Sequence, residues 1–219
     1  MINNIKDVPI IHGENGITVA LFYDLCRMGK LSYLLEHVDW IGKKPAVMRN
    51  SESITCHLFP SLGRGQYGMG EPDAVIICLG KFAVFIEVEA EYIERFETTF
   101  YKQFARFIAI GKKLESDNKK RFVKQYFFTE DKKRKTRGGY NTRKFIADLL
   151  KHKCMSYYLV IARGASNSVD KLRKAIIQKN PDLADVLDTR LGWLSLGSVM
   201  RFRCLSQNAR KIIQFNLKG

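Results

Sequence analysis

Apolar residues recur at helical spacing along several stretches of the chain. Between residues 14 and 28 they fall on one helical face, and Gly29 then provides a stop. A longer helix is predicted over residues 93–114, where four phenylalanines and one isoleucine share a side. Shorter helices are predicted over residues 31–36, 144–151, 168–178 and 181–191.

Continuous apolar runs predict buried strands. The runs at residues 74–79 and 82–88 are joined at Gly80-Lys81 and read as a hairpin, whose first arm is apolar at every position, as in a strand covered on both faces. Further strands are predicted within residues 38–48, at 122–128 and at 157–162.

Strands interspersed with helices predict an α/β fold with a mixed sheet flanked by helices. At 219 residues the chain is expected to form a single domain over residues 1–219. Its core is expected at about 14–128, and a C-terminal elaboration of helices and strand at about 140–219. The last stretch, 193–217, alternates apolar and basic residues and fits neither period clearly.

The net charge and its uneven distribution along the chain give the strongest indication of function. The chain carries a formal net charge of +15 with a pI of about 9.7, which favours a phosphate-rich partner. Yet the stretch from Glu71 to Glu97 holds seven carboxylates against Lys81 and Arg95, a net of −5. A carboxylate cluster would repel a polyanion unless a divalent cation neutralised it, so we expect Mg²⁺ or Mn²⁺ there.

Other chemistries lack their sequence signals. The five cysteines form no CxxC pair and the four histidines have no zinc-ligand spacing, so reduced thiols are expected. No apolar run reaches membrane-spanning length, and residues 1–10 do not resemble a signal peptide. We therefore expect a cytoplasmic protein that has no membrane partner. The GxGxxG match at 63–68 precedes a strand, which is the wrong context for dinucleotide binding.

The length of the hairpin loop decides whether the carboxylates meet. A three-residue connection at 79–81 pairs Cys78 with Phe82 and sets Asp73 beside Glu87, whereas a two-residue turn would send these carboxylates to opposite faces. Strand period two puts Glu89 on the same face as Glu87. Carboxylates that converge in this way can hold Mg²⁺.

Pro72-Asp73, an apolar strand and then Ile86-Glu87-Val88-Glu89 resemble the motif of the PD-(D/E)xK nuclease superfamily, which has a restriction-endonuclease-like fold. The resemblance implies Asp73 and Glu87 as metal ligands, with the Val88 carbonyl completing the shell. It implies Glu14 on the first helix as a further ligand to metal or water, and Gln103 as the polar residue on the following helix. Glu89 stands where the family has lysine; as in some restriction enzymes, it would assist the attacking water.

Simpler interpretations exist for the same carboxylates. Glu87, Glu89 and Glu91 fit the solvent face of an edge strand, and Glu14 fits a helix N-terminus. Glu91, Glu94 and Glu97 read as ordinary acids at a helix start.

Two functions follow. The first is a magnesium-dependent DNA endonuclease, in restriction, defence or repair, and the second a catalytically inactive nucleic-acid-binding protein on a nuclease-like fold. RNA as the substrate and a homodimer are left open. Basic residues in loops and at a helix end are expected to contact phosphates: Arg64, Lys112, Lys113, Lys119, Lys120, Lys132, Lys133, Arg134, Lys135 and Arg137.

Overall fold

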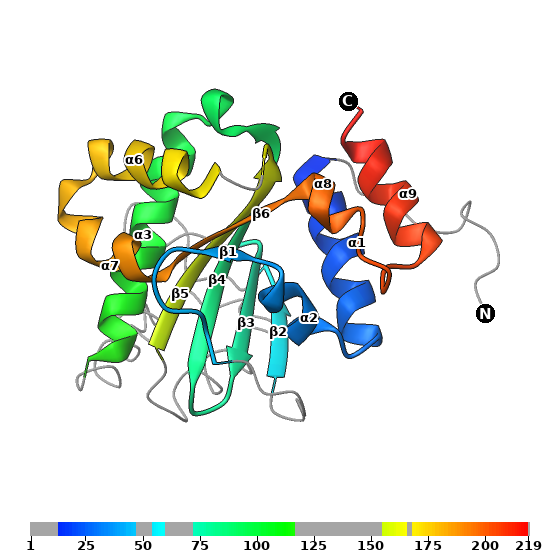
Figure 1. Ribbon diagram of the computed structural model, residues 1–219, viewed down its shortest axis with the longest axis horizontal. Coiled ribbons are helices and arrows are strands. Elements are labelled where there is room, and N and C mark those ends of the chain that lie inside the picture. The colour runs from blue at the N-terminus through cyan, green and yellow to red at the C-terminus, as the bar shows by residue number, and fades with distance from the viewer. Residues whose placement is uncertain (1–12, 47–53, 60–71, 117–154, 166–167, 219) are drawn as a thin grey trace, which may run out of the picture.

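A mixed β-sheet runs through the middle of the protein in a computed structural model that describes residues 13–46, 54–59, 72–116, 155–165 and 168–218 (Figure 1). Within these residues the sheet has six strands in the order β1-β6-β5-β4-β3-β2. The strands are β1 (Asp39–Trp40), β2 (Ile54–Leu58), β3 (Ala74–Cys78), β4 (Phe82–Tyr92), β5 (Met155–Arg163) and β6 (Leu191–Ser195).

The pairing is antiparallel at both margins of the sheet and parallel in its middle. β2, β3 and β4 pair antiparallel in sequence order, β4–β5 and β5–β6 pair parallel, and β1 lies antiparallel to β6. The sheet is therefore mixed, as predicted.

Helices cover both faces of the sheet (Figure 1). On one face lie α3 (Thr98–Glu115), α6 (Val169–Lys179) and α7 (Ala184–Arg190), and on the other α1 (Gly13–Arg27), α2 (Leu31–Glu36), α8 (Leu196–Val199) and α9 (Gln207–Asn216). Short 3₁₀ turns, η2 (Ile93–Arg95) and η4 (Pro181–Leu183), precede α3 and α7.

Alternate residues of the strands enter the two cores. In β3, Val75 and Ile77 pack beneath α3, whereas Ala74 and Ile76 pack against the α1 side. All five residues of β3 are buried, which explains why this strand is apolar without alternation.

The β3–β4 hairpin has the register that the site requires. Cys78 pairs with Phe82 and Ala74 with Ile86, so the hairpin is confirmed and its connection has three residues, the alternative that sets Asp73 beside Glu87. Gly80 adopts φ 76° in this turn, a conformation that glycine adopts without strain, and the Lys81 N–H donates to the Cys78 carbonyl at 3.0 Å.

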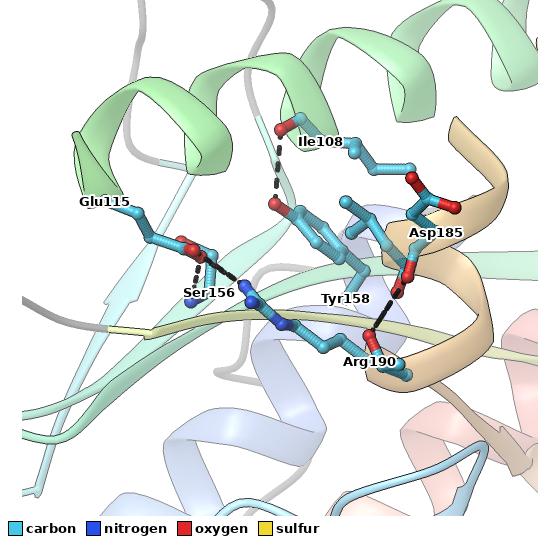
Figure 2. Close-up of polar contacts among 8 residues, drawn as sticks. Ile108, Glu115, Ser156, Tyr158, Asp185 and Arg190 are labelled. Carbon is cyan, nitrogen blue, oxygen red and sulfur yellow. Dashed lines mark hydrogen bonds and ion pairs between the residues drawn. The ribbon is translucent and has the colours of Figure 1, made fainter. Parts of the chain in front are cut away.

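A polar lock holds α3 against β5 and α7 (Figure 2). The carboxylate of Glu115 accepts from the Ser156 N–H at 2.7 Å and from the Arg190 guanidinium at 2.6 Å. The Tyr158 hydroxyl donates to the Ile108 carbonyl at 3.2 Å. Gly111 makes room for that hydroxyl, because a Cβ on Gly111 would lie 1.9 Å from it. This lock fixes the helix whose first turns border the candidate site.

Several elements differ from the sequence-based predictions. β2 was not predicted, and the expected strand at 38–48 is confined to β1. β4 continues to Tyr92, so the long helix begins at Thr98 instead of residue 93. The C-terminal part is also more than an elaboration, because β5 and β6 lie inside the sheet between β4 and β1. The predicted strand at 122–128 and helix at 144–151 lie outside the described residues.

Among the residues that the structure describes, no helix is long and apolar enough to cross a membrane.

Candidate active site

Carboxylates from three separate elements line one cavity of about 420 Å³. Glu14 comes from the first turn of α1, Asp73 directly precedes β3, and Glu87 and Glu89 lie in β4. The structure thus brings together all four acidic residues that the sequence singled out. The complete lining is Glu14, Asp73, Glu87, Glu89, Glu91, Arg95, Phe96, Glu97, Thr99, Phe100 and Gln103.

Hydrogen bonds fix three of these side chains around β4. Asp73 Oδ2 accepts from the Val88 N–H at 2.8 Å, and Glu14 Oε1 accepts from the Ala90 N–H at 3.3 Å. Gln103 Nε2 on α3 donates to Glu87 Oε1 at 3.2 Å. Each bond crosses between elements, so the acidic side chains are oriented by the fold.

β4 lies in the interior of the sheet, between β3 and β5. The interpretation of Glu87 and Glu89 as the solvent face of an edge strand is therefore wrong. Glu87 is only 6% exposed, in a strand whose preceding residues are all buried.

Burial and repulsion between the carboxylates raise the pKa values of Glu87 and Glu89. The pKa of Glu87 is raised well above its ordinary value by burial and then by the charges of Asp73 and Glu89, while the Gln103 amide acts in the opposite direction. Burial, followed by the charge and hydrogen bond of Glu14, raises the pKa of Glu89 to about 9. At neutral pH the cluster carries less than its formal charge.

Asp73 acts on Glu87 and Glu14 acts on Glu89, and each of these neighbours raises the pKa of its partner. In the described part of the chain, no three His, Cys, Asp or Glu side chains are arranged as ligands for one ion. The donor chemistry fits a hard divalent cation, since these groups offer only oxygen.

Val88 has a backbone position compatible with a ligand role. Its N–H points past the start of β3 to Asp73. The N–H and C=O of one strand residue point to the same side, so the Val88 carbonyl also faces the Asp73 side of the strand.

Six lining residues were not predicted as part of the site: Glu91, Arg95, Phe96, Glu97, Thr99 and Phe100. Glu91 lies in β4, so its interpretation as an acid at a helix start is wrong. Its carboxylate forms an ion pair with the Arg95 guanidinium at 3.3 Å. Glu97 is the N-cap residue of α3, but it also borders the cavity. The spacing of Glu87, Glu89 and Glu91 at period two was the signal for extending the strand.

Only two of the predicted phosphate-contacting residues lie within the described part of the chain. Lys112 and Lys113 are exposed in the last turns of α3. Nine residues of helix separate Lys112 from Gln103, roughly 14 Å along the helix axis, so the structure does not place these lysines at the cavity. Outside the described residues lie Arg64, Lys119, Lys120, Lys132, Lys133, Arg134, Lys135 and Arg137.

The chain matches no protein-family profile, no curated protein and no solved structure.

Proposed function

We propose that the protein is a nuclease that hydrolyses phosphodiester bonds in DNA with Mg²⁺ or Mn²⁺ as cofactor. The observation that carries this proposal is the convergence of Glu14, Asp73, Glu87 and Glu89 in one cavity. Six carboxyl groups line that cavity and one arginine joins them there, in a chain whose net charge is +15. An acidic centre of this kind in a basic protein suits a site where a cation mediates contact with a polyanion.

Asp73, Glu87, the Val88 carbonyl and Glu14 are the groups that would hold the cation. An ion there would act as a Lewis acid, which acidifies water and offsets charge on the phosphoryl oxygens. The raised pKa values of Glu87 and Glu89 support this assignment, because a cluster with this much repulsion gains most from a cation.

Glu89 would act on the attacking water. Water adds to phosphorus and the bond from phosphorus to the leaving oxygen breaks. The attacking water loses one proton, and a second water from solvent protonates the leaving oxygen. Ionised Glu89 would accept the water proton. Gln103 would orient Glu87 through the bond to Oε1.

The order of elements also supports the proposal. A helix with Glu14, a hairpin with Asp73 and Glu87, and a helix with Gln103 follow one another as in the PD-(D/E)xK resemblance. Glu89 in place of the family's lysine favours a second candidate, a non-catalytic nucleic-acid-binding protein. DNA is the partner we favour, RNA and a homodimer are alternatives, and a cytoplasmic location remains a prediction.

Calorimetric titration with Mg²⁺ and with Mn²⁺, followed by plasmid nicking on the same samples, tests the proposal. We expect metal uptake and nicking in the wild type, and loss of both in Glu87→Gln. Glu36→Gln, an exposed acid on α2, is the matched control and should behave as the wild type. DNA binding without metal uptake or nicking would favour the non-catalytic alternative, and an RNA substrate in parallel tests the substrate class.

A further inference from the structure

A second, basic cavity of about 160 Å³ lies beside the acidic one. Tyr92, Ile93 and Glu94 line the basic cavity, whereas the flanking Glu91 and Arg95 line the acidic cavity. The two cavities thus share the short segment at the end of β4.

A β-bulge creates this division. β4 pairs regularly with β5 up to Glu89 and Ala162, and the register then shifts so that Tyr92 pairs with Arg163. Bulges re-aim side chains and are frequent beside functional sites. Here the bulge lies between the part of β4 that carries the acids and the part that borders Arg163.

The floor of the basic cavity is held rigidly. The Ala165 carbonyl accepts from the buried Trp193 indole at 3.0 Å. Gly164 passes close above the same ring, because a Cβ at this position would lie 3.0 Å from Trp193 Cζ2 and 3.0 Å from Ser168 Oγ.

Ser168 is the least explained polar group in this cavity. It is 8% exposed, lines the cavity and stands at the N-cap of α6, yet its side chain makes no capping hydrogen bond. Among the described residues its hydroxyl has no hydrogen-bond partner. This hydroxyl is therefore available to a ligand in the cavity.

Two cations and a helix start surround this hydroxyl. The Arg163 guanidinium donates to the Leu217 carbonyl, and its buried Nε has no partner among the described residues. Lys171 reaches Glu94 at 3.5 Å in an exposed pair, which is weak enough for the lysine to change partner. The first turn of α6, 11 residues long, presents N–H groups that have no partner within the helix.

We propose that Ser168, Lys171, Arg163 and the first turn of α6 form a binding subsite for a phosphodiester group of the nucleic-acid backbone. The choice of nucleic acid as the ligand rests on the proposed function. The subsite would hold a non-reacting phosphate next to the acidic cavity, and so orient the strand whose scissile phosphate lies there.

Fluorescence anisotropy of a labelled DNA duplex, measured over a range of NaCl concentrations in EDTA, tests the subsite without cleavage. Lys171→Gln should reduce the slope of log K against log[NaCl] by about 0.9, the value for one lost phosphate contact. Lys174→Gln, an exposed lysine one turn along α6 that does not line the cavity, is the matched control and should keep the wild-type slope.

Two further variants separate a subsite from a damaged fold. Ser168→Ala should weaken binding roughly tenfold with an unchanged melting temperature, because no capping bond is lost. Glu94→Gln should bind about two- to threefold more tightly, since Lys171 loses its competing carboxylate, while Glu36→Gln should not. Inorganic phosphate should compete with the duplex in the wild type and less well in Ser168→Ala.

The outcomes separate this inference from the nuclease proposal. A wild type that nicks DNA, with Lys171→Gln and Ser168→Ala binding unchanged, would overturn the subsite and leave the nuclease intact. The predicted slopes in a protein that never nicks DNA would support the subsite and count against the nuclease. Equal losses in Lys171→Gln and Lys174→Gln would mean a diffuse basic surface and overturn the subsite.

Discussion

Replacing Glu89 by glutamine should stabilise the metal-free protein, and the gain should grow with pH. Burial and Glu14 raise the pKa of Glu89 to about 9 from an ordinary 4.5. A carboxyl whose pKa is raised on folding favours the folded state fully below pH 4.5, and this contribution is lost as pH rises through 9. A glutamine side chain has nearly the same shape as glutamate and can donate a hydrogen bond to Glu14. It does not become charged as the pH rises.

The size of the effect follows from the pKa difference. Each pH unit between 4.5 and 9 lowers the free energy of unfolding of the wild type by at most about 1.4 kcal/mol. Glu89 is only partly buried, so solvent screening reduces this to about 0.3–0.6 kcal/mol. Between pH 5 and pH 8 the variant should gain about 1–2 kcal/mol over the wild type, or about 3–6 °C in melting temperature for a chain of this size.

Thermal and urea melts in EDTA at pH 5, 6, 7 and 8 measure this gain. Glu94→Gln is the control, because backbone and Lys171 hydrogen bonds lower the pKa of Glu94 and its contribution has the opposite sign. That variant should show no gain that rises with pH. A Glu89→Gln protein no more stable than the wild type at pH 8, or equally stabilised at pH 5, would refute the reasoning.

Three further predictions address the ligand, the lock and the first acid pair. Saturating Mg²⁺ at about 100 times its dissociation constant should stabilise the wild type by about 2.7 kcal/mol, and Glu87→Gln should lose this protection in the same melts. Gly111→Ala should cost about 1–3 kcal/mol in urea melts, because its Cβ would lie 1.9 Å from the Tyr158 hydroxyl; adding Tyr158→Phe should recover part of the loss. Asp73→Asn can keep the bond from the Val88 N–H, so calorimetry should detect no Mg²⁺ uptake while the fold survives in EDTA.

Elements that depend on residues close together in the sequence could be predicted from the sequence alone. The β3–β4 hairpin was predictable because two apolar runs flank Gly80-Lys81, whereas the choice between a two-residue and a three-residue connection, which sets the register, needed the structure. The end of α1 was predictable because Gly29 adopts φ 63° and the Lys30 N–H returns to the Leu25 carbonyl at 2.8 Å. The meeting of Asp73 with Glu87 follows from that register alone.

The remaining features could not be predicted from the sequence, because they depend on pairing between distant segments. β6 (Leu191–Ser195) begins at the end of a predicted helix and continues into a stretch that alternates apolar and basic residues, and it becomes a strand through its pairing with β5 and β1. The bulge in β4 was equally invisible, since it depends on the register with β5. Ser168 and Arg163 gave no signal in sequence, because only the fold places them at one cavity.

The position of the acids explains how such an unfavourable cluster can persist. Glu87 lies in an interior strand, between two cores, and the Glu115–Arg190 lock fixes the helix that carries Gln103. A rigid scaffold keeps carboxylates close at a cost in stability, whereas a flexible loop would let them move apart. Under the proposed function, a divalent cation would recover that stability by neutralising the carboxylates. Selection for stability alone would favour glutamine at position 89, so a glutamate at this position fits a role that requires its charge.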